Sequence, residues 1–421
     1  VRILVSDPLS EEGLKILENE NDFKVDIKTK LTPPELLLEI KNYDVLLVRS
    51  STKVTKEVID AGTKLRIIGR AGVGLDNVDL DAASKKGIIV MNTRAGNTIT
   101  TAEHAFSLIM SLMRNIPQAN ASMKRGEWDR KKFMGAELHG KTLGIVGLGR
   151  IGTEVATRAN SFKMRVLAYD PFLSIEKAKE LGIEVVDLEE LLKNSDIITV
   201  HTPLTDQTKH LIGEEAFKIM KYGVRLINCA RGGIIDEAAL NKYAESGKVA
   251  GAALDVYENE PPKGSPLIAR DNVIMTPHLG ASTEEAQVNV AIDIAESVRD
   301  ALLNKGIRNA VNMPSVDPEV LKYMEPYLNL AEKIGSFQAQ ITDGHIKNVK
   351  VRYIGEITSK DTSPLTITLM KGLLTPILQE NVNYVNARVI AKERGINIVE
   401  SKSSDIEDFA NLITVEVETN K

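Results

Sequence analysis

The sequence contains little cysteine, few aromatic residues and no long apolar segment. Among its 421 residues there is one cysteine, Cys229, so no disulfide can form within the chain, and a reducing cytoplasmic compartment is expected. No apolar run approaches the length of a membrane span. The first residues already read as a strand, so we expect neither a membrane segment nor a signal peptide.

The sequence also lacks an excess of basic charge. Lys and Arg total 53 against 58 Asp and Glu, a net charge of −5, and no cluster of basic residues suggests a nucleic-acid partner. With 43% hydrophobic and 26% charged residues, the chain is neither disordered nor fibrous. It is too long for one compact core, so two or three domains are expected.

Short apolar runs alternate with helical stretches through most of the chain. Such alternation predicts α/β domains with parallel sheets and crossover helices. The candidate strands before residue 96 are 3–5, 45–48, 67–68 and 88–90. After a long helix at 97–113 the rhythm restarts, with candidate strands at 143–146, 165–169, 197–200, 225–228, 251–254 and 273–275. We therefore expect a doubly wound domain at 97–283, inserted in a smaller α/β domain made of 1–96 and 284–305.

The remainder of the chain reads as a linker and a third unit. Residues 306–318 are polar with two prolines and form the expected linker, followed by an α+β domain at 319–421. Alternation predicts strands around Val349–Tyr353 and Thr366–Met370, a helix over 372–394 and a last strand at 412–418. A sequence that stops on a strand suggests that further sequence lies downstream.

A glycine loop, Gly147-Leu-Gly149-Arg-Ile-Gly152, joins the apolar strand 143–146 to a helix expected at 153–162. Alone the spacing is a weak signal, since such glycines also occur in plain turns, but a strand before it and a helix after it favour a dinucleotide site. Gly147 permits the tight turn, Gly149 lets the backbone approach the pyrophosphate, and Gly152 lets the helix pack on the strand. Amide groups at the helix start would face the phosphates.

An acidic residue, Asp170, follows the next strand, eighteen residues after Gly152. A carboxylate at this position accepts hydrogen bonds from the ribose hydroxyls of NAD and repels the 2′-phosphate of NADP. The alternative is a solvated acid in the turn with Pro171. The spacing favours the nucleotide and predicts NAD as the cofactor.

A cation and a histidine follow two later strands of the same domain. Arg231 comes after strand 225–228 and His278 after strand 273–275, at the sheet edge where doubly wound domains bind ligands. Hydride exchange with a small hydroxy acid needs a cation for the carboxylate and a base for the hydroxyl proton. The Arg fork suits a carboxylate, and His titrates near neutrality. The bland alternatives are a surface salt bridge and a structural histidine.

A carboxylate beside this histidine would favour the imidazolium and orient the ring. The segment 253–262 offers both Glu258 and Glu260, and spacing alone does not choose between them. His201 ends a strand, so its turn is expected to contact the cofactor. The other weaker candidates for the base are His104, His139 and His210.

These motifs together resemble the D-2-hydroxyacid dehydrogenase family, and within it the phosphoglycerate dehydrogenase group. The similarity rests on the glycine loop and on the runs 69–79, 128–135, 228–233, 254–261 and 277–281, and it covers nearly the whole chain. The resemblance implies a flavodoxin-like substrate domain and a homodimer or homotetramer. It implies no metal.

The resemblance also implies residue roles. Arg231, Glu260 and His278 would be catalytic, with Glu260 as the partner of the histidine. Cys229 would contribute its backbone, since a small apolar residue is the simpler reading of its side chain. The implied cofactor contacts are Gly147, Gly149, Arg150, Ile151, Gly152, Asp170, Thr202, Pro203, Cys229, Ala230, Asp255, Gly280 and Ala281.

For the substrate, the resemblance implies contacts from Arg49, Ser50, Gly72, Val73, Asn97 and Arg130. Arg49 is the phosphate candidate, because a guanidinium matches phosphate geometry. Arg130 would reach across from a neighbouring subunit, although one charge in a basic run is an equally good reading. Many members of the family carry Thr where this chain has Val73, which leaves only a backbone role there.

The implied activity is NAD-dependent oxidation of 3-phosphoglycerate to 3-phosphohydroxypyruvate, the entry to serine biosynthesis. One alternative is a reductase for glyoxylate, hydroxypyruvate or another 2-keto acid. A second, from another class, is an NAD-sensing corepressor-like binding protein on the same scaffold. The third unit resembles the intervening domain of long-form members. Those members continue into an ACT domain, which this sequence does not show, although the third unit could itself carry a regulatory site.

Overall fold

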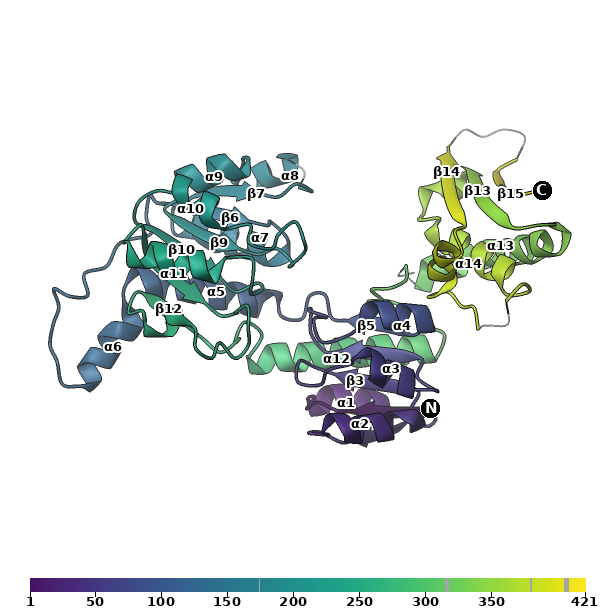
Figure 1. Ribbon diagram of the computed structural model, residues 1–421, viewed down its shortest axis with the longest axis horizontal. Helices are drawn as coiled ribbons and strands as arrows, with labels where there is room; N and C mark the ends of the chain where they lie inside the picture. Colours follow the sequence, from purple (N-terminus) through teal and green to yellow (C-terminus); the bar gives the residue numbers. More distant parts are fainter. Residues whose placement is uncertain (174, 315–317, 379–380, 405–408) are drawn as a thin grey trace. The chain divides into compact units, whose positions relative to one another are not determined.

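A computed structural model describes residues 1–173, 175–314, 318–378, 381–404 and 409–421 (Figure 1). The chain divides into two compact units, one formed by Val1–Gly96 with Gln287–Lys421 and the other by Asn97–Ala286. The chain crosses between them twice, so the second unit is inserted in the first.

Residues 1–96 form a parallel five-stranded sheet, ordered β2-β1-β3-β4-β5. This order is that of flavodoxin-like domains. The expected strands are present, and one more, β2, lies at the edge, where its half-exposed residues gave no apolar run. The strands are β1 (Arg2–Val5), β2 (Lys24–Ile27), β3 (Val45–Val48), β4 (Ile67–Arg70) and β5 (Ile89–Asn92).

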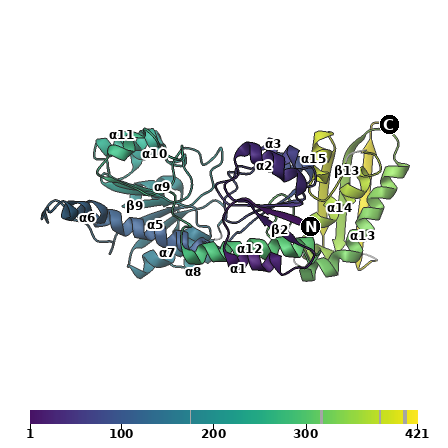
Figure 2. The same ribbon diagram turned by 90° about the horizontal axis from the view of Figure 1, so that it is seen from below.

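Helices cover both faces of this sheet. In Figure 2, α1 and α12 lie on one face and α2 and α3 on the other. Two buried clusters correspond to these faces, one holding Leu17, Ile294 and Val298 and the other Ile40 and Ile59. The helices are α1 (Glu11–Glu18), α2 (Pro33–Glu39), η1 (Ile40–Asn42), α3 (Lys56–Ala61), α4 (Leu80–Lys86) and α12 (Glu284–Leu302).

The inserted unit contains a parallel seven-stranded sheet, ordered β12-β11-β10-β9-β6-β7-β8. Its first strand lies centrally and the order reverses beside it, which is the doubly wound arrangement of dinucleotide-binding domains. The strands are β6 (Thr142–Val146), β7 (Arg165–Tyr169), β8 (Glu184–Val185), β9 (Ile197–Val200), β10 (Val224–Asn228), β11 (Val249–Leu254) and β12 (Val273–Met275).

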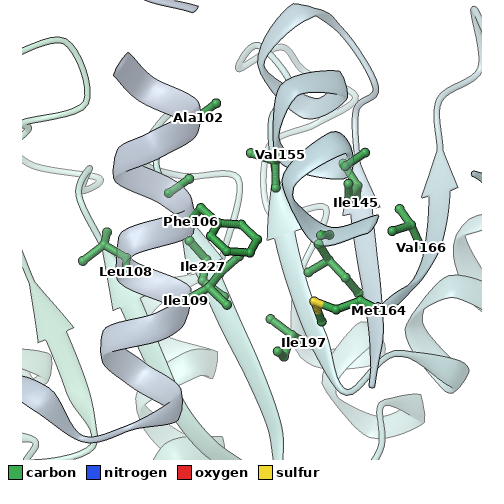
Figure 3. Close-up of a cluster of buried hydrophobic side chains, with 14 of the residues drawn as sticks. Ala102, Phe106, Leu108, Ile109, Ile145, Val155, Met164, Val166, Ile197 and Ile227 are labelled. Atoms are coloured by element: carbon green, nitrogen blue, oxygen red, sulfur yellow. The ribbon is translucent and has the colours of Figure 1, made fainter. Parts of the chain in front are cut away.

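Two helical layers enclose this sheet. Figure 3 shows Phe106 and Ile109 of one helix, α5, facing Val155 of another, α7, above the strands. A second cluster fills the opposite face, with Phe217 and Leu240 among its members. The helices are α5 (Thr98–Met113), α6 (Ile116–Lys124), α7 (Arg150–Ser161), α8 (Ile175–Glu180), α9 (Leu188–Asn194), α10 (Glu214–Ile219), α11 (Glu237–Glu245) and η2 (Pro266–Ala269).

The C-terminal residues form a mixed sheet, in which β13 pairs in parallel with β14 and antiparallel with β15. Two helices, α13 and α14, cross closely, since a Cβ on Gly335 would lie 2.1 Å from the carbonyl oxygen of Leu369. The elements are α13 (Pro318–Ile341), β13 (Ile346–Gly355), η3 (Glu356–Ser359), α14 (Ser363–Leu374), α15 (Ala387–Glu393), β14 (Asn397–Ser403) and β15 (Asn411–Thr419).

Two expectations for this region were wrong. The segment Thr366–Met370 lies in a helix, α14. Most residues of that helix are buried, so its apolar pattern shows no helical period that sequence alone could reveal. The helix expected over 372–394 is instead the end of α14, an irregular stretch after Pro376, and α15. Residues 379–380 of that expected helix lie outside the described residues. The strand expected at 412–418 is confirmed within β15.

Candidate active site

The glycine loop has the geometry that a bound pyrophosphate requires. Gly147 has φ +93°. The helix α7 begins at Arg150, directly after Gly149 and three residues before the expected start at 153. A Cβ on Gly152 would lie 2.2 Å from the carbonyl oxygen of Gly147, whereas a Cβ on Gly149 would meet nothing within 4 Å. The space beside Gly149 and the amides at the start of α7 therefore suit a phosphate group.

Asp170 and Thr202 flank this loop. Asp170 accepts hydrogen bonds from the backbone amides of Leu148 and Phe172, each at 2.9 Å, which orients its carboxylate. The Thr202 hydroxyl is buried and has no hydrogen-bond partner within the described ranges, while its methyl group packs where a Cβ of Gly147 would lie. An orphaned hydroxyl beside an open phosphate cradle fits NAD.

Asn228, the last residue of β10, fixes the loop that carries Arg231. Asn228 donates to the carbonyl of Arg231 at 2.8 Å and accepts from the amide of Ala230 at 3.0 Å. Arg231 is half-buried, with Nη1 donating to the Ala230 carbonyl at 2.7 Å. The guanidinium is thus held at the carboxyl end of β10.

His278 and Glu260 are brought together. Nδ1 of His278 lies 2.9 Å and 3.1 Å from the two carboxylate oxygens of Glu260. His278 adopts φ +55°, a left-handed conformation that is uncommon for residues other than glycine and is typical of functional sites. Its side chain is 51% exposed, which leaves Nε2 available to a substrate. Glu260, and not Glu258, is the partner of His278.

Asp255 anchors the segment that bears His278. Its buried carboxylate accepts from the hydroxyl of Thr276 at 2.6 Å and from the amides of Leu279 and Gly280 at 2.7 and 2.8 Å. Burial opposes ionisation, but the hydrogen bonds from His104, Thr276 and Leu279 hold the pKa of Asp255 below its usual value. A contact between Asp255 and the nicotinamide stays a prediction.

Two other residues of this region have strongly shifted pKa values. Burial raises the pKa of the Cys229 thiol well above its usual range, and nearby Asp255 adds to this, so a thiolate role is disfavoured. Burial lowers the pKa of His201 to about 4, and its Nε2 lies 2.9 Å from the hydroxyl of Thr199. His201 is therefore neutral near pH 7 and is a poor proton shuttle.

In the other unit, a scaffold of polar side chains fixes the loop of Arg49. Asp7 accepts from the amides of Arg49 and Thr52, at 2.6 and 3.1 Å, and Asn77 donates to the carbonyls of the same two residues. Nε of Arg49 is buried and lacks a hydrogen-bond partner among the described residues. Burial lowers the pKa of Arg49, which an anionic ligand would offset. The neighbouring Ser50 is exposed.

Sequence reasoning missed Arg70 at the end of the adjacent strand, β4. Gly72 has φ +140°, and a Cβ there would lie 1.8 Å from Nη1 of Arg70, so the guanidinium lies directly over this glycine. Asn92 donates to the carbonyl of Val73 at 2.5 Å and fixes the same turn. Parallel strands β3 and β4 end at one edge, which was the available signal for a second cation beside Arg49.

Two remaining substrate candidates belong to the inserted unit. Asn97 precedes α5, and its Oδ1 is buried and unpartnered within the described chain. Arg130 is exposed in the segment 125–137. In the portion of the chain that the structure describes, no group of three or more His, Cys, Asp or Glu is placed to hold a metal ion. None of the helices in that portion is long and apolar enough to cross a membrane.

Comparison with family models identifies the NAD-binding unit and the C-terminal domain. Residues 106–280 match the D-isomer specific 2-hydroxyacid dehydrogenase NAD binding domain. Residues 323–421 match the D-3-phosphoglycerate dehydrogenase intervening domain. The chain therefore belongs to the D-2-hydroxyacid dehydrogenase family, whose NAD-binding domain is the doubly wound unit described above.

Full-length relatives narrow the assignment. The chain is 50% identical over 421 residues to D-3-phosphoglycerate dehydrogenase of Archaeoglobus fulgidus, covering 100% of this chain and 80% of that protein. It is 45% identical over 403 residues to the human enzyme of the same name, covering 96% and 75%. Within its family the chain belongs with the D-3-phosphoglycerate dehydrogenases.

Solved structures agree with the fold. D-lactate dehydrogenase from Aquifex aeolicus, complexed with NAD and lactic acid, matches with a TM-score of 0.66 and 32% identity over 75% of this chain and 100% of that one. NAD-dependent formate dehydrogenase from Staphylococcus aureus, in complex with NAD, matches with a TM-score of 0.68 and 29% identity over 75% of this chain and 100% of that one. The prediction of NAD as the cofactor is confirmed at the level of the family.

Proposed function

We propose that the chain oxidises 3-phosphoglycerate at C2 to 3-phosphohydroxypyruvate, the first step of serine biosynthesis, through Arg231, Glu260 and His278. The observation that carries the proposal is the contact of His278 Nδ1 with both carboxylate oxygens of Glu260, at 2.9 and 3.1 Å. Bound NAD supplies the acceptor for the hydride that leaves C2.

His278 takes the hydroxyl proton of the substrate. Since Glu260 contacts Nδ1, the proton-accepting atom is Nε2. The carboxylate stabilises the imidazolium that forms and keeps the ring in one orientation. Arg231 binds the substrate carboxylate and polarises the C2 oxygen, because a guanidinium offers paired donors to a carboxylate.

Arg49 binds the phosphate of the substrate, and Arg70 adds a second cation to the same task. The supporting observations are the buried, unpartnered Nε of Arg49 and the placement of Arg70 over Gly72. The backbone around Gly72 and Val73 and the side chains of Ser50 and Asn97 complete the set of substrate contacts.

The test compares the wild type with Arg49→Ala and Arg49→Lys on two substrates. NADH absorbance follows oxidation of phosphoglycerate in one direction and reduction of unphosphorylated hydroxypyruvate in the other. Losing a charge-assisted contact to phosphate should lower kcat/KM for phosphoglycerate about 10- to 100-fold in the Ala variant, with a smaller loss for Lys. Hydroxypyruvate reduction should change little.

Two results would contradict the proposal. If phosphoglycerate oxidation survives Arg49→Ala intact, the substrate assignment fails and the 2-keto acid reductase becomes the better reading. If the wild type binds NAD but shows no turnover with phosphoglycerate at mM concentration, the binding-protein alternative gains.

The chain assembles as a homo-oligomer through α6 and the segment 125–137. Together these two stretches are named the arm. Support comes from large apolar side chains that are exposed there, with Trp128 75% and Met134 80% exposed. Exposed apolar residues of this size typically mark an interface. Within the oligomer, Arg130 on the arm contacts the substrate of a neighbouring subunit.

The protein acts in the cytoplasm. The support is its single cysteine, which is buried and free, as is usual for proteins of a reducing compartment.

A further inference from the structure

We propose that His210 and Glu258 are positioning residues, which hold the Glu260 loop (255–262) against the Arg231 loop (228–236). The inference rests on the proposed function, because it concerns how the residues assigned to catalysis are aligned. It gives a role to the second glutamate of the Glu260 loop, Glu258, whose carboxylate contacts His210 and the amide of Glu237.

Glu258 and Glu237 bind each other reciprocally. The backbone amide of Glu258 donates to the Glu237 carboxylate at 2.6 Å, and the amide of Glu237 donates to the Glu258 carboxylate at 3.3 Å. Glu237 begins α11, immediately after the Arg231 loop. The pair therefore attaches the Glu260 loop to the helix that follows the Arg231 loop.

The two loops also touch through their backbones. A Cβ on Gly232 would lie 1.8 Å from the carbonyl oxygen of Tyr257 and 2.6 Å from the amide nitrogen of Glu258. Only glycine fits this approach, so a shift of either loop is passed to the other. Arg231 precedes this contact by one residue, and Glu260 follows it by two.

His210 brings a third segment into the arrangement. Its Nε2 lies 3.1 Å from the Glu258 carboxylate, and its amide donates to the carbonyl of Gly233 at 2.7 Å. The residue has φ +50°, a strained conformation for a side chain of this size. His210 therefore joins the two loops, with its ring on one and its backbone on the other, from the segment after β9 that carries the predicted cofactor contact Thr202.

The histidine also faces two acidic side chains. Its two ring nitrogens face Glu258, at 3.1 Å from Nε2, and Asp236, at 3.9 Å from Nδ1, while Glu237 lies against Glu258. Burial raises the pKa of Glu237. The hydrogen bond from the Glu258 amide opposes this rise, and the carboxylates of Glu258 and Asp236 add to it. A donor from His210 stabilises this crowded set, so removing it should loosen the loop that presents Glu260 to His278.

The connection to the catalytic pair is short. The amide of Tyr257, next to Glu258, donates to Oε1 of Glu260 at 3.2 Å. The Tyr257 hydroxyl donates to the carbonyl of Thr276 at 2.7 Å, in the segment that bears His278. Displacement of residues 257–258 therefore moves the carboxylate and the imidazole relative to each other.

The experiment uses the full chain and five variants: His210→Ala, His210→Gln, Glu258→Ala, Glu258→Gln and Lys209→Ala. Glutamine can keep a hydrogen bond at either position, and at position 258 it removes the carboxylate charge. Lys209 is an exposed neighbour outside this network. Misplacement of a catalytic group lowers kcat steeply, so both Ala variants should lose about 10-fold in kcat with phosphoglycerate. The KM for NAD should stay within about twofold, and the Gln variants should recover most of the loss.

A second measurement does not depend on activity. Hydrogen–deuterium exchange of the peptide 255–262 should be faster in both Ala variants than in the wild type and in Lys209→Ala. Unchanged exchange together with unchanged kcat overturns the inference, as does a fall in Tm with kcat retained, because the contacts would then be merely structural. Gln variants as impaired as the Ala variants also overturn it. If the wild type fails to oxidise phosphoglycerate, the proposed function fails, and exchange alone decides whether these residues hold the loop.

Discussion

Glu260 contacts His278 with both carboxylate oxygens, so its charge is the property to test at the residue scale. Glu260→Gln keeps the shape of the side chain but removes the charge that stabilises the imidazolium. We expect kcat to fall about 10- to 100-fold, with little change in the KM for NAD, measured by NADH absorbance.

The matched reference for this variant is His278→Asn, since Asn tolerates the left-handed backbone conformation that His278 adopts. It should reduce kcat by about 10²-fold or more while the protein remains folded. A Glu260→Gln enzyme with wild-type kcat would show that the pair is structural.

His201 predicts a pH dependence of stability. Burial lowers its folded pKa from 6.5 to about 4, so the unfolded chain binds a proton at a higher pH than the folded chain does. Its contribution to the free energy of unfolding is complete above about pH 6.5. That contribution is lost as the pH falls through this window towards 4. Denaturant unfolding of the wild type and His201→Gln between pH 4 and 7 should show a weaker pH dependence in the variant. Parallel curves would contradict this.

At the scale of elements, the glycine loop separates stability from cofactor binding. A Cβ on Gly152 would overlap the Gly147 carbonyl at 2.2 Å, so Gly152→Ala should shift α7 and lower the free energy of unfolding by about 1–3 kcal/mol. Gly149 has open space around its Cβ position, so Gly149→Ala should leave Tm nearly unchanged but weaken NAD binding, because the methyl group occupies room needed by the pyrophosphate.

Thermal unfolding and NAD titration by calorimetry check this pair of variants. Equal losses of Tm in both variants would contradict this separation, because the Gly149→Ala methyl group should meet no neighbouring atom in the protein. Equal NAD affinities of wild type and Gly149→Ala would place the pyrophosphate elsewhere.

The parallel sheets could be predicted because buried parallel strands are continuous apolar runs, as in Val45–Val48 and Ile197–Val200. An edge strand, Lys24–Ile27, lacks such a run and was missed. Thr366–Met370 was read as a strand because a helix that is buried on every side has no polar face to reveal its period.

Some residues of the candidate site could also be predicted from sequence, and others could not. The Glu260–His278 contact agrees with the expected pairing, but the sequence could not choose Glu260 over Glu258 without a family resemblance. Asp7 and Arg70 act through strand ends that are adjacent only in the folded sheet, so spacing along the chain does not reveal them. The scaffold around Glu258 was unpredictable for the same reason.

At the scale of the whole molecule, the exposed apolar arm predicts an oligomer. Replacing Trp128 and Met134, the most exposed large apolar side chains of the arm, by Asp should place charges in the interface and yield monomers. Light scattering after size-exclusion chromatography measures the mass. Leu38→Asp, at an apolar residue 67% exposed on α2, is the control and should keep the wild-type mass. A monomeric wild type would contradict the proposal.

The insertion of one unit in the other has a consequence for synthesis on the ribosome. The sheet of residues 1–96 needs α12 to cover one face, with Val290, Ile294 and Val298 in its buried cluster. Translation must therefore pass nearly two hundred further residues before that face can be closed, whereas the inserted unit is continuous in sequence. The nascent chain thus carries an uncovered apolar face on the sheet of residues 1–96 while the second unit is already able to fold. Chaperone binding to residues 1–96 should therefore peak before residue 298 emerges from the ribosome.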